Sequence, residues 1–195
     1  MNFESVQKNL QNNGFAVTCF STVEEACAYL SEKLTGKTVA HGGSMTLQDM
    51  GLLDRLDECA TLYRHKSGGD GVEAMTCQVY LSSVNGLAET GEIINIDGAC
   101  NRVASTMYGH EEVYFVVGKN KIAPDYDSAL WRARNIAAPL NAKRLNRKTP
   151  CAVKGDKCYN CNSPERICRG LTVLWKKPIM IKHAEVVLVD QELGY

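Results

Sequence analysis

The stretch that decides the fold is residues 37–57, KTVAHGGSMTLQDMGLLDRLD. It begins with Thr38 to His41, a short apolar run typical of a buried strand, and two glycines follow directly. Four apolar residues then recur at helical spacing: Leu47, Met50, Leu53 and Leu56. Thr46 and Asp49 have the spacing of a capping box at the start of this helix. The stretch therefore predicts a strand, a glycine turn and a helix, the repeating unit of α/β proteins.

Strand-like and helix-like segments alternate on both sides of this unit. Helices are predicted at 3–13, from the capping box Thr22-Val23-Glu24-Glu25 to Leu34, at 99–108 and at 126–144. Strands are predicted at 15–20, 60–64, 78–84, 113–117, 171–175 and 185–189, with a hairpin over 88–96. This order favours an α/β sandwich with a mostly parallel central sheet, in which ligands bind outside the carboxyl ends of the strands.

Composition limits the class of protein. The chain has 195 residues, 45% of them hydrophobic, and its 22 basic and 22 acidic residues cancel. We therefore expect one globular α/β domain over 1–195, and we exclude a disordered polyelectrolyte and a wholly basic nucleic-acid protein. No apolar run approaches the roughly 20 residues of a membrane span, and residues 1–15 lack the apolar core of a secretory signal. We expect a cytoplasmic protein.

The charge is divided unevenly along the chain. Residues 143–182 carry 11 Lys and Arg but only Asp156 and Glu165, a balance of +9, so the remainder carries −9. Such a split indicates an anionic partner or prosthetic group near the basic segment. No series of base-stacking aromatic residues accompanies these charges, so we predict no nucleic-acid partner.

Three motifs supply candidate ligand-binding residues. Gly42, Gly43 and Ser44 precede a helix, where free N–H groups suit a phosphate, a carboxylate or a CoA-type ligand; the alternative is an ordinary tight turn. Lys119 and Lys121 follow an apolar strand, where they would meet an acidic substrate or simply face water.

The third motif spans residues 85–102. Glu89 is a candidate base or nucleophile, Asn85 and Asn95 could orient a substrate, and Arg102 could clamp a carboxylate. The alternative is structural, because Asn, Asp and Gly also form turns and a carboxylate beside a hairpin turn is usually solvated.

Four cysteines in residues 149–170 give the strongest local signal. Cys151, Cys158, Cys161 and Cys168 suit tetrahedral zinc or an iron–sulfur cluster, because both prefer sulfur ligands. The neighbouring basic residues would offset the negative charge of either centre: Lys154, Lys157, Arg166 and Arg169. The spacing does not distinguish zinc from a cluster, and two disulfides or free thiols are the alternatives.

Four segments resemble the LUD domain of lactate-utilization proteins. They are VAHGGSMTLQDMG at 39–51, VNGLAETGEIINIDGACNR at 84–102, VVGKNKIAP at 116–124 and ELG at 192–194, and the cysteine segment is similar to one in short family members. The resemblance implies a NagB/RpiA/CoA-transferase-like fold and a link to the oxidation of L-lactate to pyruvate alongside iron–sulfur partner proteins. The resemblance also implies that the residues matching the family motifs belong to the functional site: Gly42, Gly43, Ser44, Asn85, Glu89, Gly91, Asp97, Gly98, Asn101, Arg102 and Lys121. This chain departs from the family pattern at Gly86, where Ala is usual, and at Ala88, where Thr is usual.

Three functions follow as hypotheses. The first is a metal- or cluster-containing subunit or accessory of a system that oxidises lactate or a similar hydroxy acid. The second is an enzyme without redox chemistry that acts on a sugar phosphate or CoA ester through Glu89 and the glycine loop. The third is a sensor or assembly protein for a small anion. The sequence leaves the substrate, the site of catalysis and the oligomeric state open.

Overall fold

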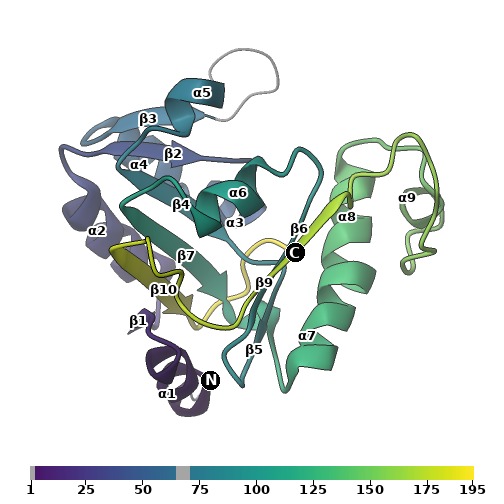
Figure 1. The fold of residues 1–195 in the computed structure, drawn as a ribbon, viewed down its shortest axis with the longest axis horizontal. Coiled ribbons are helices and arrows are strands. Elements are labelled where there is room, and N and C mark those ends of the chain that lie inside the picture. Colours follow the sequence, from purple (N-terminus) through teal and green to yellow (C-terminus); the bar gives the residue numbers. More distant parts are fainter. Residues whose placement is uncertain (1–2, 65–70) are drawn as a thin grey trace.

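A six-stranded sheet forms the centre of the molecule in the computed structural model, which describes residues 3–64 and 71–195. Its strands lie in the order β1 (Ala16–Phe20), β10 (His183–Val189), β7 (Glu112–Gly118), β4 (Val79–Ser83), β2 (Thr38–His41) and β3 (Thr61–Arg64). Every neighbouring pair is parallel, so all the carboxyl ends meet at one edge. Figure 1 shows these strands with the helices around them.

Three helices cover one face of this sheet: α2 (Val23–Leu34), α3 (Met45–Asp49) and α4 (Leu52–Asp57). Their apolar side chains, Leu30 and Leu47 among them, pack in one cluster with strand residues such as Val39 and Val187. The Thr22 hydroxyl accepts a hydrogen bond from Glu25 N, and the Glu25 carboxylate accepts one from Thr22 N, which confirms the predicted capping box.

The opposite face packs against α1 (Glu4–Asn12), α5 (Gly71–Ala74) and a second, smaller sheet. This sheet has the order β8 (Ile122–Ala123), β5 (Gly86–Ala88), β6 (Ile93–Asp97) and β9 (Gly170–Leu174). The antiparallel pairing of β5 with β6 confirms the predicted hairpin. Helix α6 (Asn101–Met107) follows β6, and a short 3-10 turn, η1 (Lys119–Lys121), follows β7.

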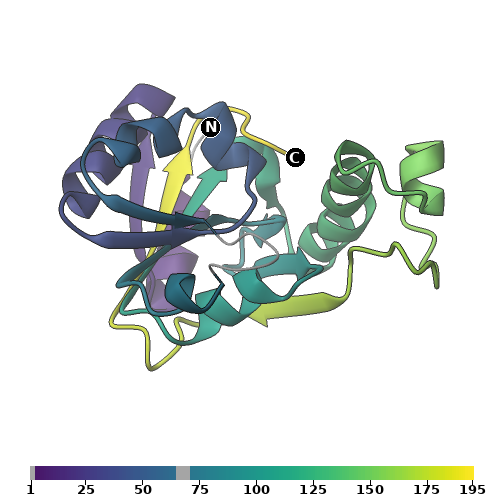
Figure 2. The same cartoon turned by 90° about the horizontal axis from the view of Figure 1, so that it is seen from above.

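A third layer lies on the outer face of the second sheet. Helix α7 (Tyr126–Arg132), the wider π-helical turn η2 (Ala133–Ala137) and α8 (Ala138–Arg144) form one continuous rod, seen clearly in Figures 1 and 2. Small residues such as Ala129 and Ala133 pack on Ala88, Ala123 and Ile94 of the smaller sheet. Beyond the rod lies α9 (Pro150–Lys154), which belongs to the cysteine segment.

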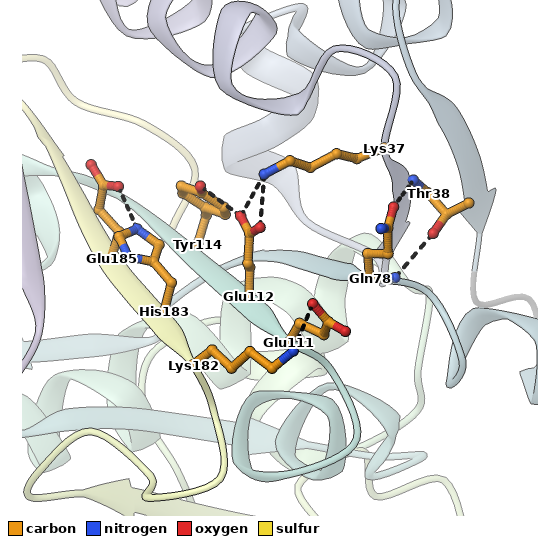
Figure 3. A network of polar contacts seen from close by, with 9 residues as sticks. All are labelled: Lys37, Thr38, Gln78, Glu111, Glu112, Tyr114, Lys182, His183 and Glu185. Atoms are coloured by element: carbon orange, nitrogen blue, oxygen red, sulfur yellow. Dashed lines mark hydrogen bonds and ion pairs between the residues drawn. The ribbon is translucent and has the colours of Figure 1, made fainter.

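A polar network lies near the amino ends of the central strands, at the edge opposite the carboxyl ends (Figure 3). Lys37 Nζ donates to both carboxylate oxygens of Glu112, at 2.7 and 2.8 Å, and Tyr114 donates to the same carboxylate at 3.0 Å. On β10, His183 Nε2 lies 2.9 Å from the carboxylate of buried Glu185. Hydrogen bonds therefore tie charged groups together at this end of the sheet.

The predicted α/β class with a mostly parallel sheet is confirmed, and two local predictions are wrong. Ser44, not Thr46, caps α3, because its hydroxyl accepts from Leu47 N. The helix predicted to follow the glycines is two short helices, because Gly51 has a left-handed φ of 63° that ends the first. Among the described residues, no helix has both the length and the apolar character to cross a membrane.

Candidate functional site

A cleft of about 440 Å³ lies beside the carboxyl end of β2 and the end of β6. One part of its lining consists of Gly42 and Gly43 after β2, Asn85, and residues 96–99, 101 and 102 at the end of β6 and the start of α6. The rest of the lining comes from the end of the rod, between Ala137 and Leu145, and from the cysteine segment. The cysteine segment contributes residues 164–167 and 169, and it lies directly beside the end of β6, where Arg169 N donates to Asp97 O at 2.9 Å. The cleft therefore lies outside the carboxyl ends of the strands, where ligands of parallel α/β sheets usually bind.

The cleft is strongly basic because five arginines line it: Arg102, Arg144, Arg147, Arg166 and Arg169. Its two acidic residues are already engaged with main-chain amides. The Asp97 carboxylate accepts from the amides of Gly98, Arg102 and Val103, at 2.7, 2.9 and 3.3 Å, and so caps α6. The Glu165 carboxylate accepts from Lys148 N at 2.8 Å.

Neutral oxygen atoms hold four of these arginines in place. Arg102 donates to Ile96 O at 2.7 Å, and Arg144 donates to Asn141 Oδ1. Arg166 donates to the carbonyls of Cys168 and Cys161, while Arg169 donates to those of Arg166 and Pro164. No carboxylate within the described ranges forms an ion pair with any of the five. Their positive charge is therefore available to an anion in the cleft.

The glycine loop brings main chain close to the cleft. A Cβ on Gly42 would lie 3.0 Å from the Tyr80 hydroxyl and 3.4 Å from Asn101 Nδ2, so glycine permits the close packing of these three residues. Gly43 is exposed and has open space around it. A ligand can approach the main chain there without meeting a side chain.

A smaller cavity of about 40 Å³ adjoins the cleft and reaches Lys121. The two share six lining residues: Gly43, Asn85, Arg102, Ala137, Asn141 and Arg144. Lys121 is 4% exposed, and its Nζ donates to Thr46 Oγ1, Ser83 Oγ and Val84 O, at 2.7, 2.9 and 3.1 Å. Burial, followed by the positive charges of Arg132 and Arg102, lowers the pKa of Lys121 from 10.5 to about 7.

The structure gathers most of the candidate residues from the sequence. The cleft is lined by Gly42, Gly43, Asn85, Asp97, Gly98, Asn101 and Arg102, and the small cavity adds Ser44 and Lys121. Asn95 is buried within β6 and is not among these lining residues.

Glu89 and Gly91 lie elsewhere, in the turn between β5 and β6. Asn9 Nδ2 of α1 donates to the Glu89 carbonyl at 2.7 Å, and a Cβ on Gly91 would lie 2.5 Å from Asn13 Nδ2. Neither residue lines the cleft or the small cavity. The structure therefore gives Glu89 no position from which to act on a ligand bound there.

The sequence did not predict the part of the cleft lining that comes from α8 and the cysteine segment. Asn141, Arg144 and Arg147 come from the end of α8 and the residues after it, and Arg166 and Arg169 were considered only as neighbours of the cysteines. The available signal was the charge of residues 143–182, which indicated an anionic partner without locating it.

Two of the four cysteines line a hollow that shares residues with the cleft. Cys158 and Cys168 line a hollow of about 200 Å³ together with Arg134, Arg166 and Arg169, and burial raises the pKa of the Cys168 thiol. Cys151 Sγ lies 3.3 Å from the Thr149 hydroxyl. In residues 3–64 and 71–195, no three His, Cys, Asp or Glu side chains are arranged to hold a metal ion. The metal or cluster site therefore stays a prediction.

Comparisons with known proteins place the chain in a family. The model of the LUD domain matches residues 3–189. A crystal structure of a DUF162 family protein from Deinococcus radiodurans matches with a TM-score of 0.58 and 14% identity, over 95% of this chain and 94% of that one. The structure of eIF2B beta from Chaetomium thermophilum matches at a TM-score of only 0.40, with 14% identity over 54% of this chain and 44% of that one.

A search of the curated proteins gives no match. At 14% identity the Deinococcus structure shows a shared fold and nothing finer. The family model, by contrast, covers nearly the whole chain. The chain therefore belongs to the LUD-domain family.

Proposed function

We propose that this protein binds a small organic acid, lactate or its oxidation product pyruvate, in the arginine-lined cleft, as a subunit or accessory of a lactate-utilization system. The observation that carries the proposal is the basic cleft itself, with five arginines and with both of its carboxylates bound to main-chain amides. Membership of the LUD-domain family supports the choice of lactate as the acid.

The lining residues suggest how such an acid would bind. Arg102 and Arg144 line both the cleft and the small cavity, so they are placed to hold a carboxylate. Asn85 and Asn101 offer amide groups to a hydroxyl or carbonyl oxygen, and Ala137 offers an apolar contact to a methyl group.

The proposal assigns to this chain the binding of the acid. Oxidation of lactate releases electrons that an acceptor must take, and iron–sulfur partner proteins are the acceptors that we propose. Cys151, Cys158, Cys161 and Cys168 enter no step of this proposal, because the structure does not bring the four thiols into a common site.

Ligand titration of single-arginine variants tests the proposal. Lactate and pyruvate should raise the Tm of the wild-type protein, because a ligand of the native state stabilises it by mass action. Arg102→Gln and Arg144→Gln should each weaken binding about tenfold or more through the loss of a charge-assisted hydrogen bond. The matched control is Arg55→Gln, an exposed residue of α4 outside the cleft, which should bind as the wild type does. Unchanged affinity in both cleft variants would contradict the proposal.

The volume of the cleft favours a second candidate ligand, a larger anion such as a sugar phosphate or a CoA ester. A volume of about 440 Å³ is more than a three-carbon acid fills, and Arg147, Arg166 and Arg169 line the part that does not adjoin the small cavity. Arg166→Gln and Arg169→Gln should weaken the binding of a sugar phosphate or CoA and leave lactate binding unchanged. Equal losses for both kinds of ligand would remove this candidate.

A further inference from the structure

We propose that Lys121 is a covalent site for the carbonyl group of a 2-oxo acid such as pyruvate, which the lysine amine binds as an imine. The inference rests on the proposed function, because it names the class of acid that reaches the inner end of the cleft. The evidence for it is the environment of the buried Lys121 amine.

The contacts of Lys121 are unusual for a buried cation. Its three hydrogen-bond acceptors, Thr46 Oγ1, Ser83 Oγ and Val84 O, are all neutral. A buried charge is normally paired with an opposite charge, because its transfer out of water is otherwise costly. The charged groups that act on Lys121 are Arg132 of α7 and Arg102 of α6, which are both repulsive, and Asp49 of α3, which favours the charged form.

This environment leaves a substantial fraction of the amine neutral near neutral pH. With a pKa of about 7, about half of the Lys121 side chains carry a free lone pair at pH 7. Burial and neighbouring cations are the two conditions that make a lysine nucleophilic toward carbonyl compounds.

A small cavity beside the cleft borders this amine. Lys121 and Ser83 line the cavity of about 40 Å³, and Arg102 and Arg144 line both this cavity and the cleft. An acid whose carboxylate contacts these two arginines can therefore extend its adjacent carbon into the cavity that Lys121 lines. The Thr46 and Ser83 hydroxyls, 2.7 and 2.9 Å from Nζ, can pass protons to and from the reacting atoms.

The reaction needs no oxidant or reductant. The lone pair of Nζ forms a bond to the carbonyl carbon, and the carbonyl oxygen takes a proton to give a carbinolamine. The hydroxyl then takes a second proton and leaves as water while the nitrogen lone pair forms the C=N bond. The resulting iminium loses its remaining N–H proton, so the two hydrogens of the amine end up in the water. Water reverses the reaction. Lactate has a hydroxyl group in place of the carbonyl, so the site would separate a 2-oxo acid from the matching 2-hydroxy acid.

Reductive trapping tests the inference. The wild-type protein is incubated with pyruvate and sodium cyanoborohydride, which reduces an imine to a stable secondary amine, and the product is examined by intact mass and peptide mapping. We expect one adduct per chain, on the peptide that contains Lys121, and no adduct with lactate. Lys121→Arg should lose the adduct. Lys119→Arg is the matched control and should retain it, because Lys119 is more exposed and pairs with Asp190.

Two results would overturn the inference. One is an adduct spread over other lysines and equal in Lys121→Arg. The other is no adduct while pyruvate still raises the Tm, which leaves the anion-binding site intact and removes the imine. If pyruvate neither stabilises the protein nor forms an adduct, the proposed function fails for this acid as well. Peptide mapping of the wild type identifies the modified residue even if a Lys121 variant fails to fold.

Discussion

Lys121 links protonation to stability at the scale of a single residue. Its pKa is about 7 in the folded protein and 10.5 in the ordinary, solvated state. Between these pH values the unfolded chain holds a proton that the folded chain has released. The free energy of unfolding should therefore rise with pH across this window, by at most about 1.4 kcal/mol per pH unit from this group.

Urea unfolding at several pH values checks this expectation. Lys121→Met has no titratable group at this position, so the stability of the wild type relative to this variant should increase as the pH rises from about 7 to about 9. Lys119→Met changes a lysine that is 40% exposed and pairs with Asp190, and it should give a curve parallel to that of the wild type in this pH range. A parallel curve for Lys121→Met would show that Lys121 titrates normally.

Glu89 offers a second test at the residue scale. Its turn packs against Asn9 and Asn13 of the α1 region and lines neither the cleft nor the small cavity. Glu89→Gln should therefore leave the affinity for lactate, pyruvate or a sugar phosphate unchanged in the titration described above. A large loss of affinity would mean that the turn reaches the ligand in a different conformation.

At the scale of elements, Gly86 sets how closely α7 approaches β5. A Cβ at this position would lie 2.5 Å from the Ala129 carbonyl oxygen, a main-chain atom that cannot move without its helix. Gly86→Ala should destabilise the protein by about 1–3 kcal/mol, as overpacking of a core usually does. Chemical denaturation measures the change. Gly43→Ala is the control: its Cβ would meet nothing within 4 Å, so the free energy of unfolding should stay close to that of the wild type.

Elements were easier to predict from the sequence than the site they form. Apolar periodicity depends on neighbouring residues, so the strand at 38–41 and the hairpin of β5 and β6 could be located directly. The break at Gly51 was missed because apolar spacing continues through it, whereas a left-handed φ does not show in that spacing. The capping box was wrongly predicted at Thr46 and Asp49 because Ser44 and Thr46 are both residue types that cap helices, and the spacing of Thr46 and Asp49 fits a capping box.

The basic wall of the cleft could not be predicted for a different reason. Asn85 and Arg102 were found because they share a short motif, and that motif supplies a continuous part of the cleft lining. Arg144 and Arg166 line the same cleft only because the rod packs against the second sheet through α7 and η2 and because the cysteine segment returns to β9. Such contacts between distant segments depend on tertiary packing, which the local motifs and periodicity of one sequence do not reveal.

At the scale of the whole molecule, the two ends of the central sheet carry different polar groups. The carboxyl end faces the basic cleft, whereas the amino end holds the network of Figure 3. Burial alone would raise the pKa of Glu185, but hydrogen bonds from His183, Thr18 and Tyr29 outweigh it, so the pKa lies below its ordinary value of 4.5. Glu185 therefore stabilises the fold above about pH 4.5, and this contribution is lost as the pH falls through the lower folded value.

Replacement of Glu185 tests whether the polar network at the amino end of the sheet acts independently of the cleft at the carboxyl end. Glu185→Gln should lower the free energy of unfolding at pH 7 by about 1–3 kcal/mol, because it weakens three hydrogen bonds to a buried group, and should flatten the loss of stability in acid. Anion binding should not change. Glu111→Gln removes one partner of the exposed Lys182–Glu111 ion pair and should cost no more than about 1 kcal/mol. Weaker anion binding in Glu185→Gln would show that the two ends are coupled.

The position of β10 has a consequence for biosynthesis. This strand follows the others in the chain, yet it lies between β1 and β7, and among the strands that the structure describes β1 pairs with β10 alone. During translation, the main-chain N–H and C=O groups of β1 therefore stay unpaired until residues 183–189 have left the ribosomal exit tunnel. A nascent chain stalled before that point would expose this edge to chaperones or to other nascent chains.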